Sequence, residues 1–173
     1  MMETYCSFSR KRNDYHRKHH DSEHGLPAKD DDDLFRRLML EISQAGLSFD
    51  TVLKRKEGIY KAFSRINLVA KFTESDVEKL MHNEGIIRNR KKIEAAIFNA
   101  QRIKDLQKSH GSFRKWLDAS KGMEKEGWVK LFRSNFRFTG KEIVNEFLMS
   151  AGYLQGAHDD DCPKKLDALN KNL

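Results

Sequence analysis

The chain has 173 residues, and its hydrophobic and aromatic content is enough for one domain with a packed core. Lys and Arg outnumber Asp and Glu by 33 to 26, an excess that favours a polyanionic partner such as nucleic acid without identifying one. No apolar run reaches the roughly 18 residues of a membrane span, and no apolar segment follows the basic N-terminus. We therefore expect no secretory signal, no membrane partner and a cytoplasmic protein.

The middle of the chain has the pattern of successive helices. Four aspartates at 30–33 are an acidic start typical of a helix, and the apolar spacing that follows predicts one buried face. After a turn, Ser48 is placed to cap a second helix. Ser75 and Glu78 have the spacing of a capping box, which predicts a third helix.

The second half of the chain continues in the same way. Further helical segments are predicted at Arg88 to about Lys108, around 113–117 and 128–132, and after Gly140. Only residues 136–138 alternate as a strand would. We predict an all-α fold with one domain over residues 1–162 and a polar, frayed C-terminal tail over residues 163–173.

Cysteine and histidine occur near both ends of the chain in a set that can bind a metal. His158 and Cys162 are separated by three residues, so one helical turn or a tight loop can direct both at one ion. With Cys6 and His20 they form a Cys2His2 set, which is typical of a closed, structural zinc site. Spacing alone leaves two alternatives open: exposed histidines with two free thiols, or another N-terminal ligand among His16, His19 and His24.

Residues 80–93 join two predicted helices through a turn that contains a glycine. Backbone N–H groups at the start of the second helix can face a phosphate, and neighbouring cations add affinity that does not depend on sequence. A plain connector with a solvated charge run is the alternative. The expected DNA-binding residues are Gly85, Ile86, Ile87, Arg88, Arg90, Lys91 and Lys92.

Three stretches carry a resemblance to one family. Residues 19–27 read HHDSEHGLP, residues 41–53 read EISQAGLSFDTVL, and residues 84–93 read EGIIRNRKKI. They resemble, in order, the YHDxEWGxP segment, the ExxQAGLSWxxxL signature and the hairpin of DNA-3-methyladenine glycosylase I, a family of the helix-hairpin-helix superfamily. The match is dense from about residue 19 to 100 and returns from 136 to 162.

The resemblance implies a helix-hairpin-helix glycosylase domain whose N- and C-terminal segments are tied by a structural zinc. It selects Cys6, His20, His158 and Cys162 as the metal ligands. The implied function is a DNA repair N-glycosylase that flips an alkylated purine, similar to 3-methyladenine, out of double-stranded DNA and hydrolyses its glycosidic bond. We expect it to act as a monomer.

The resemblance also assigns the site. Glu41 matches the pocket glutamate; it lies among apolar neighbours, where a buried carboxylate without a purpose would be costly. Phe49 matches the stacking aromatic residue, while Tyr15 and His19 are expected beside it. Gly46 and Leu47 match the turn that enters the gap left by the flipped nucleotide. The alternatives are an exposed helix acid, a core phenylalanine, and a simple helix-ending glycine followed by a core leucine.

The sequence departs from the family pattern around the base pocket. His19 stands for a tyrosine, His24 for a tryptophan and Phe49 for the stacking tryptophan, and the stretch 112–135 is shorter than usual. These changes leave a second hypothesis open, a non-catalytic zinc-stabilised binder of damaged or abasic DNA, and a third, a helical scaffold with no DNA role. No lysine has an evident nucleophilic setting, and Asp105 lies in a polar helix segment, so we predict no lyase activity.

Overall fold

The computed structural model describes residues 4–165, and within them every regular element is a helix. The all-α prediction is confirmed. Residues 136–138 form no strand, because Phe138 has a φ of 59° and breaks the extended backbone. The helices are α1 (Tyr5–Arg10), α2 (Asp14–Ser22), α3 (Asp31–Gln44), α4 (Phe49–Leu53), α5 (Lys56–Ala62), α6 (Ile66–Val69), α7 (Glu74–Met81), α8 (Arg90–His110), α9 (Phe113–Asp118), α10 (Lys125–Asn135) and α11 (Lys141–Ser150).

Local sequence signals explain where several of these helices begin. Asp30 accepts a hydrogen bond from the backbone N–H of Asp33 at the start of α3, and Ser48 caps α4 through Thr51. The capping box of α7 is real but lies two residues earlier than predicted, because Thr73 and Asp76 form it. The second predicted helix is divided into α4 and α5, while α1, α2 and α6 were not predicted.

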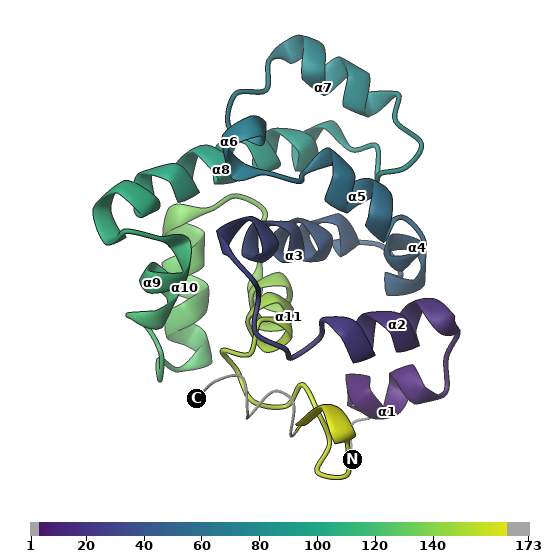
Figure 1. The fold of residues 1–173 in the computed structure, drawn as a ribbon. Coiled ribbons are helices and arrows are strands. Elements are labelled where there is room, and N and C mark those ends of the chain that lie inside the picture. Colours follow the sequence, from purple (N-terminus) through teal and green to yellow (C-terminus); the bar gives the residue numbers. More distant parts are fainter. Residues whose placement is uncertain (1–3, 166–173) are drawn as a thin grey trace.

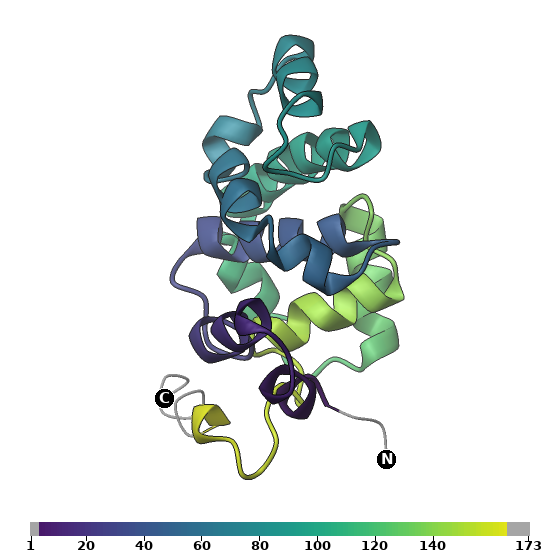
Figure 2. The ribbon, with the colours of Figure 1, turned by 90° about the vertical axis from the view of Figure 1, so that its right-hand side faces the viewer.

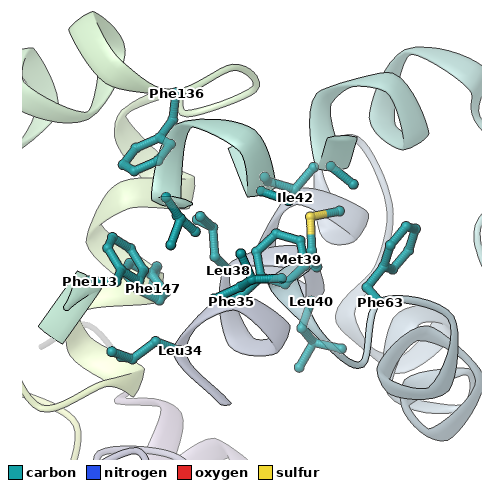
Figure 3. Close-up of a cluster of buried hydrophobic side chains, with 14 of the residues drawn as sticks. Leu34, Phe35, Leu38, Met39, Leu40, Ile42, Phe63, Phe113, Phe136 and Phe147 are labelled. Atoms are coloured by element: carbon teal, nitrogen blue, oxygen red, sulfur yellow. The ribbon is translucent and has the colours of Figure 1, made fainter. Parts of the chain in front are cut away.

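Helix α3 lies at the centre of the molecule (Figures 1 and 2). Apolar side chains surround it: Phe113, Phe136 and Phe147 lie on one side and Phe63 on another (Figure 3). Every residue of α3 from Leu34 to Ser43 is buried except Arg36. A helix covered on all faces buries whatever side chains it carries, so polar residues on α3 are withdrawn from water.

One of these polar residues, Arg37, fixes the surroundings of α3. Its guanidinium donates to Asp33 at 3.1 Å and to the carbonyl oxygens of Glu23, Leu26 and Ser150 at 2.6–3.1 Å. The segment after α2 and the end of α11 are therefore held against the same side chain. Buried charges are tolerated when they are hydrogen-bonded in this way.

The two ends of the described chain lie side by side at the bottom of Figure 1, where the yellow C-terminal segment is next to α1. Asp159 accepts hydrogen bonds from Thr4 and Ser7 at 2.6 Å, and Arg10 forms an ion pair with Asp161 at 3.0 Å. The predicted tail over 163–173 lies outside the described residues from 166 onward. No helix within 4–165 is long and apolar enough to cross a membrane.

Candidate active site

Two cavities meet at the C-terminal end of α3. The first, of about 240 Å³, is lined by residues of the α3–α4 turn and of α11, and the second, of about 340 Å³, is lined by residues of α1, α3, α4 and α11. Three side chains line both cavities: Glu41, Gln44 and Glu146. Glu41 is only 4% exposed, because its helix is central. The alternative of an exposed helix acid is therefore wrong.

Aromatic rings form the wall of the second cavity. Phe49, at the start of α4, packs against Tyr5 of α1 with ring centroids 5.7 Å apart, and both line the cavity with Phe8 and His24. The cavity thus combines flat apolar surfaces with a buried carboxyl group. Such a combination suits a flat polar ring that stacks and also donates hydrogen bonds.

The carboxyl group of Glu41 has no hydrogen-bond or ion-pair partner among residues 4–165. Burial raises its pKa well above the usual range, and the nearby charges of Glu146 and Glu23 raise it further, against a smaller opposite effect of Lys56. An unpaired buried carboxyl with a raised pKa beside a cavity is a common feature of functional sites. It can accept hydrogen bonds from a ligand and stabilise positive charge there.

His19 lies behind Phe49 and does not line either cavity. Its ring meets that of Phe49 edge-on at 5.3 Å, and its Nδ1 lies 3.0 Å from the Lys56 ammonium, which also pairs with Glu23 at 2.9 Å. Burial, and then the charge of Lys56, lower the pKa of His19, so the ring is neutral and Nδ1 accepts from the lysine. His19 therefore supports the stacking ring from behind.

Two residues of the expected pocket, His19 and Tyr15, line neither cavity, and the structure adds two others. Tyr15 is 49% exposed on α2 and lines neither cavity, because the chain places Tyr5 of α1 there instead. Glu146 was also missed. Its only signal in the sequence is a carboxyl group between the apolar positions Ile143 and Phe147 of the last helix.

The turn after α3 carries a glycine followed by an exposed leucine. Gly46 has a φ of +76°, a conformation that disfavours side chains other than glycine. Leu47 is 41% exposed at the rim of the first cavity, so it is not a core leucine. The geometry places an apolar side chain at the surface beside Glu41.

The turn between α7 and α8 packs closely on α5. A Cβ atom at Gly58 would lie 2.1 Å from the carbonyl oxygen of Gly85, so only glycine fits there. Ile86 is buried and Ile87 half-buried, and the backbone N–H groups of Ile87 and Arg88 have no hydrogen-bond partner within the described part of the chain. Such free N–H groups are those that can meet a phosphate.

Two of the four expected cations in this turn are already engaged. Lys92 is 6% exposed and donates to the carbonyl oxygens of Ser43 at 2.9 Å and Ala45 at 2.6 Å, so it caps the end of α3 rather than facing solvent. Arg90 forms ion pairs with the glutamates of α7 and with Glu94. Arg88 and Lys91 are exposed and have no ion-pair partner in residues 4–165.

The two ends of the chain bring Cys6, His20, His158 and Cys162 together, with one ligand atom from each within 4.8 Å of the others. His20 Nε2 lies 3.2 Å from His158 Nδ1, and Cys162 Sγ is 3.7 Å from both nitrogens. A tetrahedral zinc with bonds of about 2.0–2.3 Å separates its ligands by about 3.3–3.8 Å. The cluster could therefore hold a metal ion.

The surroundings of this cluster suit a metal as well. His20 Nδ1 contacts the Asp21 carboxylate at 2.8 Å, which leaves Nε2 directed at the cluster, and Arg10 lies 3.6 Å from Cys6 Sγ. A carboxylate that orients the imidazole and a cation beside a thiolate are common around metal sites. His24 and His16 point elsewhere, His24 into the second cavity and His16 toward Tyr5 at 3.2 Å.

The family model for methyladenine glycosylase matches residues 9–127, which is more than half of the chain. The chain belongs to the methyladenine glycosylase family. It is 31% identical over 172 residues to the DNA-3-methyladenine glycosylase of Haemophilus influenzae, a match that covers 85% of this chain and 90% of the relative. It is 41% identical over 97 residues to DNA-3-methyladenine glycosylase 1 of Escherichia coli, over 55% of this chain and 52% of that one.

Solved structures of methyladenine glycosylases share the fold. The 3-methyladenine DNA glycosylase I of Staphylococcus aureus superposes with a TM-score of 0.81 and 30% identity, over 93% of this chain and 96% of that chain. The predicted family is confirmed, and with it an enzyme assignment. The matched region includes α3, the Gly46 turn and the start of α8.

Proposed function

We propose that the protein is a DNA repair glycosylase that extrudes an alkylated purine similar to 3-methyladenine and hydrolyses its N-glycosidic bond. The observation that carries the proposal is the buried, unpartnered carboxyl group of Glu41 in a cavity walled by Phe49 and Tyr5. The relatives of this chain are named for 3-methyladenine, which agrees with a flat, hydrogen-bonding ligand.

An N3-alkylated adenine in DNA is a cation, so its glycosidic bond is weak. The base leaves with the electron pair of the C–N bond, water adds to the anomeric carbon, and a proton is released to solvent. Glu41 would accept hydrogen bonds from the base edge, and its carboxylate would stabilise the positive charge that passes from the base to the sugar as the bond breaks. Phe49 and Tyr5, whose rings pack against each other, would offer the base an aromatic surface. A cation in the cavity also favours the ionised form of a carboxyl group whose pKa burial has raised.

The protein would reach the base from the helical surface that carries the two turns. Leu47, exposed at the rim of the first cavity, is placed to fill the gap that a flipped nucleotide leaves. The free N–H groups of Ile87 and Arg88, with the exposed side chains of Arg88 and Lys91, would contact phosphates. Lys92 would act indirectly, by fixing the end of α3.

We infer that the enzyme has no lyase activity. A lyase needs a nucleophilic amine at the sugar, and no lysine lines either cavity beside Glu41. Lys56, whose charge acts on Glu41, is held by Glu23 and His19, and Asp105 is an exposed residue of α8 that pairs with Lys108. Cleavage would therefore stop at the abasic site.

We also infer that the cluster of Cys6, His20, His158 and Cys162 binds one structural zinc ion. Four protein ligands close the coordination shell and leave no position for substrate. The ion would tie the N-terminal helices, which carry Tyr5, to the segment after α11. It supplies stability and holds the aromatic wall in place, with no part in the bond cleavage.

Chromatography of purines released from methylated duplex DNA tests the proposed function. The wild-type protein should release 3-methyladenine with multiple turnovers, and Glu41→Gln should release it far more slowly. Glu126→Gln, which removes an exposed carboxylate of α10, should behave like the wild type. Tight, salt-sensitive binding of lesion DNA without any released base would instead favour a non-catalytic damage binder, the alternative that the changes at His19, His24 and Phe49 suggest.

A further inference from the structure

A second carboxyl group faces both cavities from the side opposite α3. Glu146, on α11, lines the first and the second cavity together with Glu41 and Gln44. It is half-buried, and like Glu41 it makes no hydrogen bond or ion pair within residues 4–165. Two acidic side chains from two different helices therefore line both cavities without an ion-pair partner, and the exposed Glu142 adds a third carboxyl group to the first cavity.

One other polar group at this site also lacks a partner. Nε2 of His24 is buried and has no hydrogen-bond partner in the described chain, and His24 lines the second cavity. A buried polar group left without a partner is costly unless a ligand or water completes it. The site is thus arranged for an occupant that is flat, polar and able to satisfy two carboxylates.

The charges around the two carboxyl groups explain why that occupant should be cationic. The titratable groups that face Glu41 are Tyr5, Glu23, Lys56 and Glu146, and those that face Glu146 also include Glu142 and Lys125. Burial is the main cause that raises the pKa of both carboxyl groups, and each has an acidic neighbour that raises it further. Because like charges in a shared cavity repel, a neutral ligand would leave that repulsion in place and a cation would relieve it.

We propose that Glu146 is a specificity-determining residue that, with Glu41, makes the pocket select a cationic base over a neutral base of the same shape. The inference rests on the proposed function, since it names the charge of the base that this site accepts. It assigns Glu146 a direct contact with the base or its exocyclic groups. Normal, uncharged adenine would then be rejected by charge as well as by its stable glycosidic bond.

Binding of two small probes tests this inference apart from catalysis. The probes are 3,9-dimethyladeninium, a permanent cation, and 9-methyladenine, its neutral counterpart, titrated into the intact protein at neutral pH and followed by NMR. The wild type should bind the cation about 10-fold or more tightly than the neutral base, the scale of one hydrogen bond to a charged group. Glu146→Gln should lose about 10-fold for the cation and nothing for the neutral base, and Glu126→Gln should match the wild type.

Each outcome decides between the two proposals. Equal affinity of the wild type for both probes, no binding of either, or an equal loss for both probes in Glu146→Gln would overturn the role of Glu146. Selective binding of the cation by a protein that releases no base from methylated DNA would overturn the enzymatic proposal and leave this inference standing. A second readout concerns the active enzyme: the acid limb of its pH–rate profile should move to lower pH in Glu146→Gln, because a like charge beside Glu41 is removed.

Discussion

Replacement of Glu41 by glutamine should make the protein more stable at neutral pH even though it damages the site. The carboxyl group is 4% exposed, has no partner in the described chain, and has a pKa that burial raises well above the usual range. In the unfolded chain the pKa of a glutamate is about 4.3. At pH values between this value and the raised pKa of Glu41 in the folded protein, the folded protein holds a proton that the unfolded chain has lost. Stability therefore falls as pH rises through this window, and glutamine removes the loss.

The size of the effect follows from the burial of the group. A buried polar group without a partner costs about 1–3 kcal/mol, and more when it is charged. We expect Glu41→Gln to gain about 1–3 kcal/mol at pH 7.5 and close to zero near pH 4, where the carboxyl group is protonated in both states. For a chain of this length, about 2–4 °C per kcal/mol gives a rise in Tm of roughly 2–12 °C.

Urea unfolding of the wild type and of Glu41→Gln at several pH values between 4 and 8 measures this difference. Glu57→Gln, which removes an exposed carboxylate of α5, serves as the control and should track the wild type at every pH. A variant that is less stable than the wild type at pH 7.5 would refute the reasoning, because it would mean that the folded protein stabilises the Glu41 carboxylate. A gain that is the same at pH 4 would also refute it, because the gain would then not come from the ionisation of Glu41.

Three further predictions concern the metal cluster, the buried lysine and the surface cations. Cys162→Ser should abolish stoichiometric zinc binding, measured by elemental analysis, and should lower Tm. A strong chelator should lower the Tm of the wild type in the same way. Full stability of the wild type without metal would contradict the zinc site. Lys92→Met leaves two carbonyl oxygens at the end of α3 without their donor, so urea unfolding should show a loss of about 1–3 kcal/mol. Neutralising Arg88 or Lys91 should each lower the slope of log affinity for DNA against log salt concentration by about one. Arg90→Gln should change this slope less, because glutamates already neutralise Arg90. Equal slopes for all three variants would contradict the distinction between the two exposed cations and the paired Arg90.

Features that depend on short stretches of sequence could be predicted. Asp30 and Ser48 begin helices because their side chains bond to backbone N–H groups three residues onward, a purely local interaction. The burial of Glu41 was also predictable, since it lies among Leu38, Met39, Leu40 and Ile42 in the sequence. The cluster of Cys6, His20, His158 and Cys162 could be predicted because the resemblance selected His20 among four N-terminal histidines.

Features that depend on contacts between distant segments could not be predicted. Lys92 belongs to a charge run that reads as solvated, but its ammonium group reaches the carbonyl oxygens of Ser43 and Ala45, nearly fifty positions away. Tyr5 was missed because α1 is short and carries no strong helix signal, and Tyr15 was chosen in its place. Glu146 lacks any sequence motif, so only the packing of α11 on α3 reveals that it shares a cavity with Glu41.

The rate of 3-methyladenine release under single-turnover conditions, with protein in excess over methylated duplex DNA, tests the role of Glu41 most directly. If Glu41 stabilises the positive charge that passes from the base to the sugar as the bond breaks, Glu41→Gln should release the base about 100-fold more slowly even when all of the DNA is bound. An unchanged rate in the variant would contradict the account.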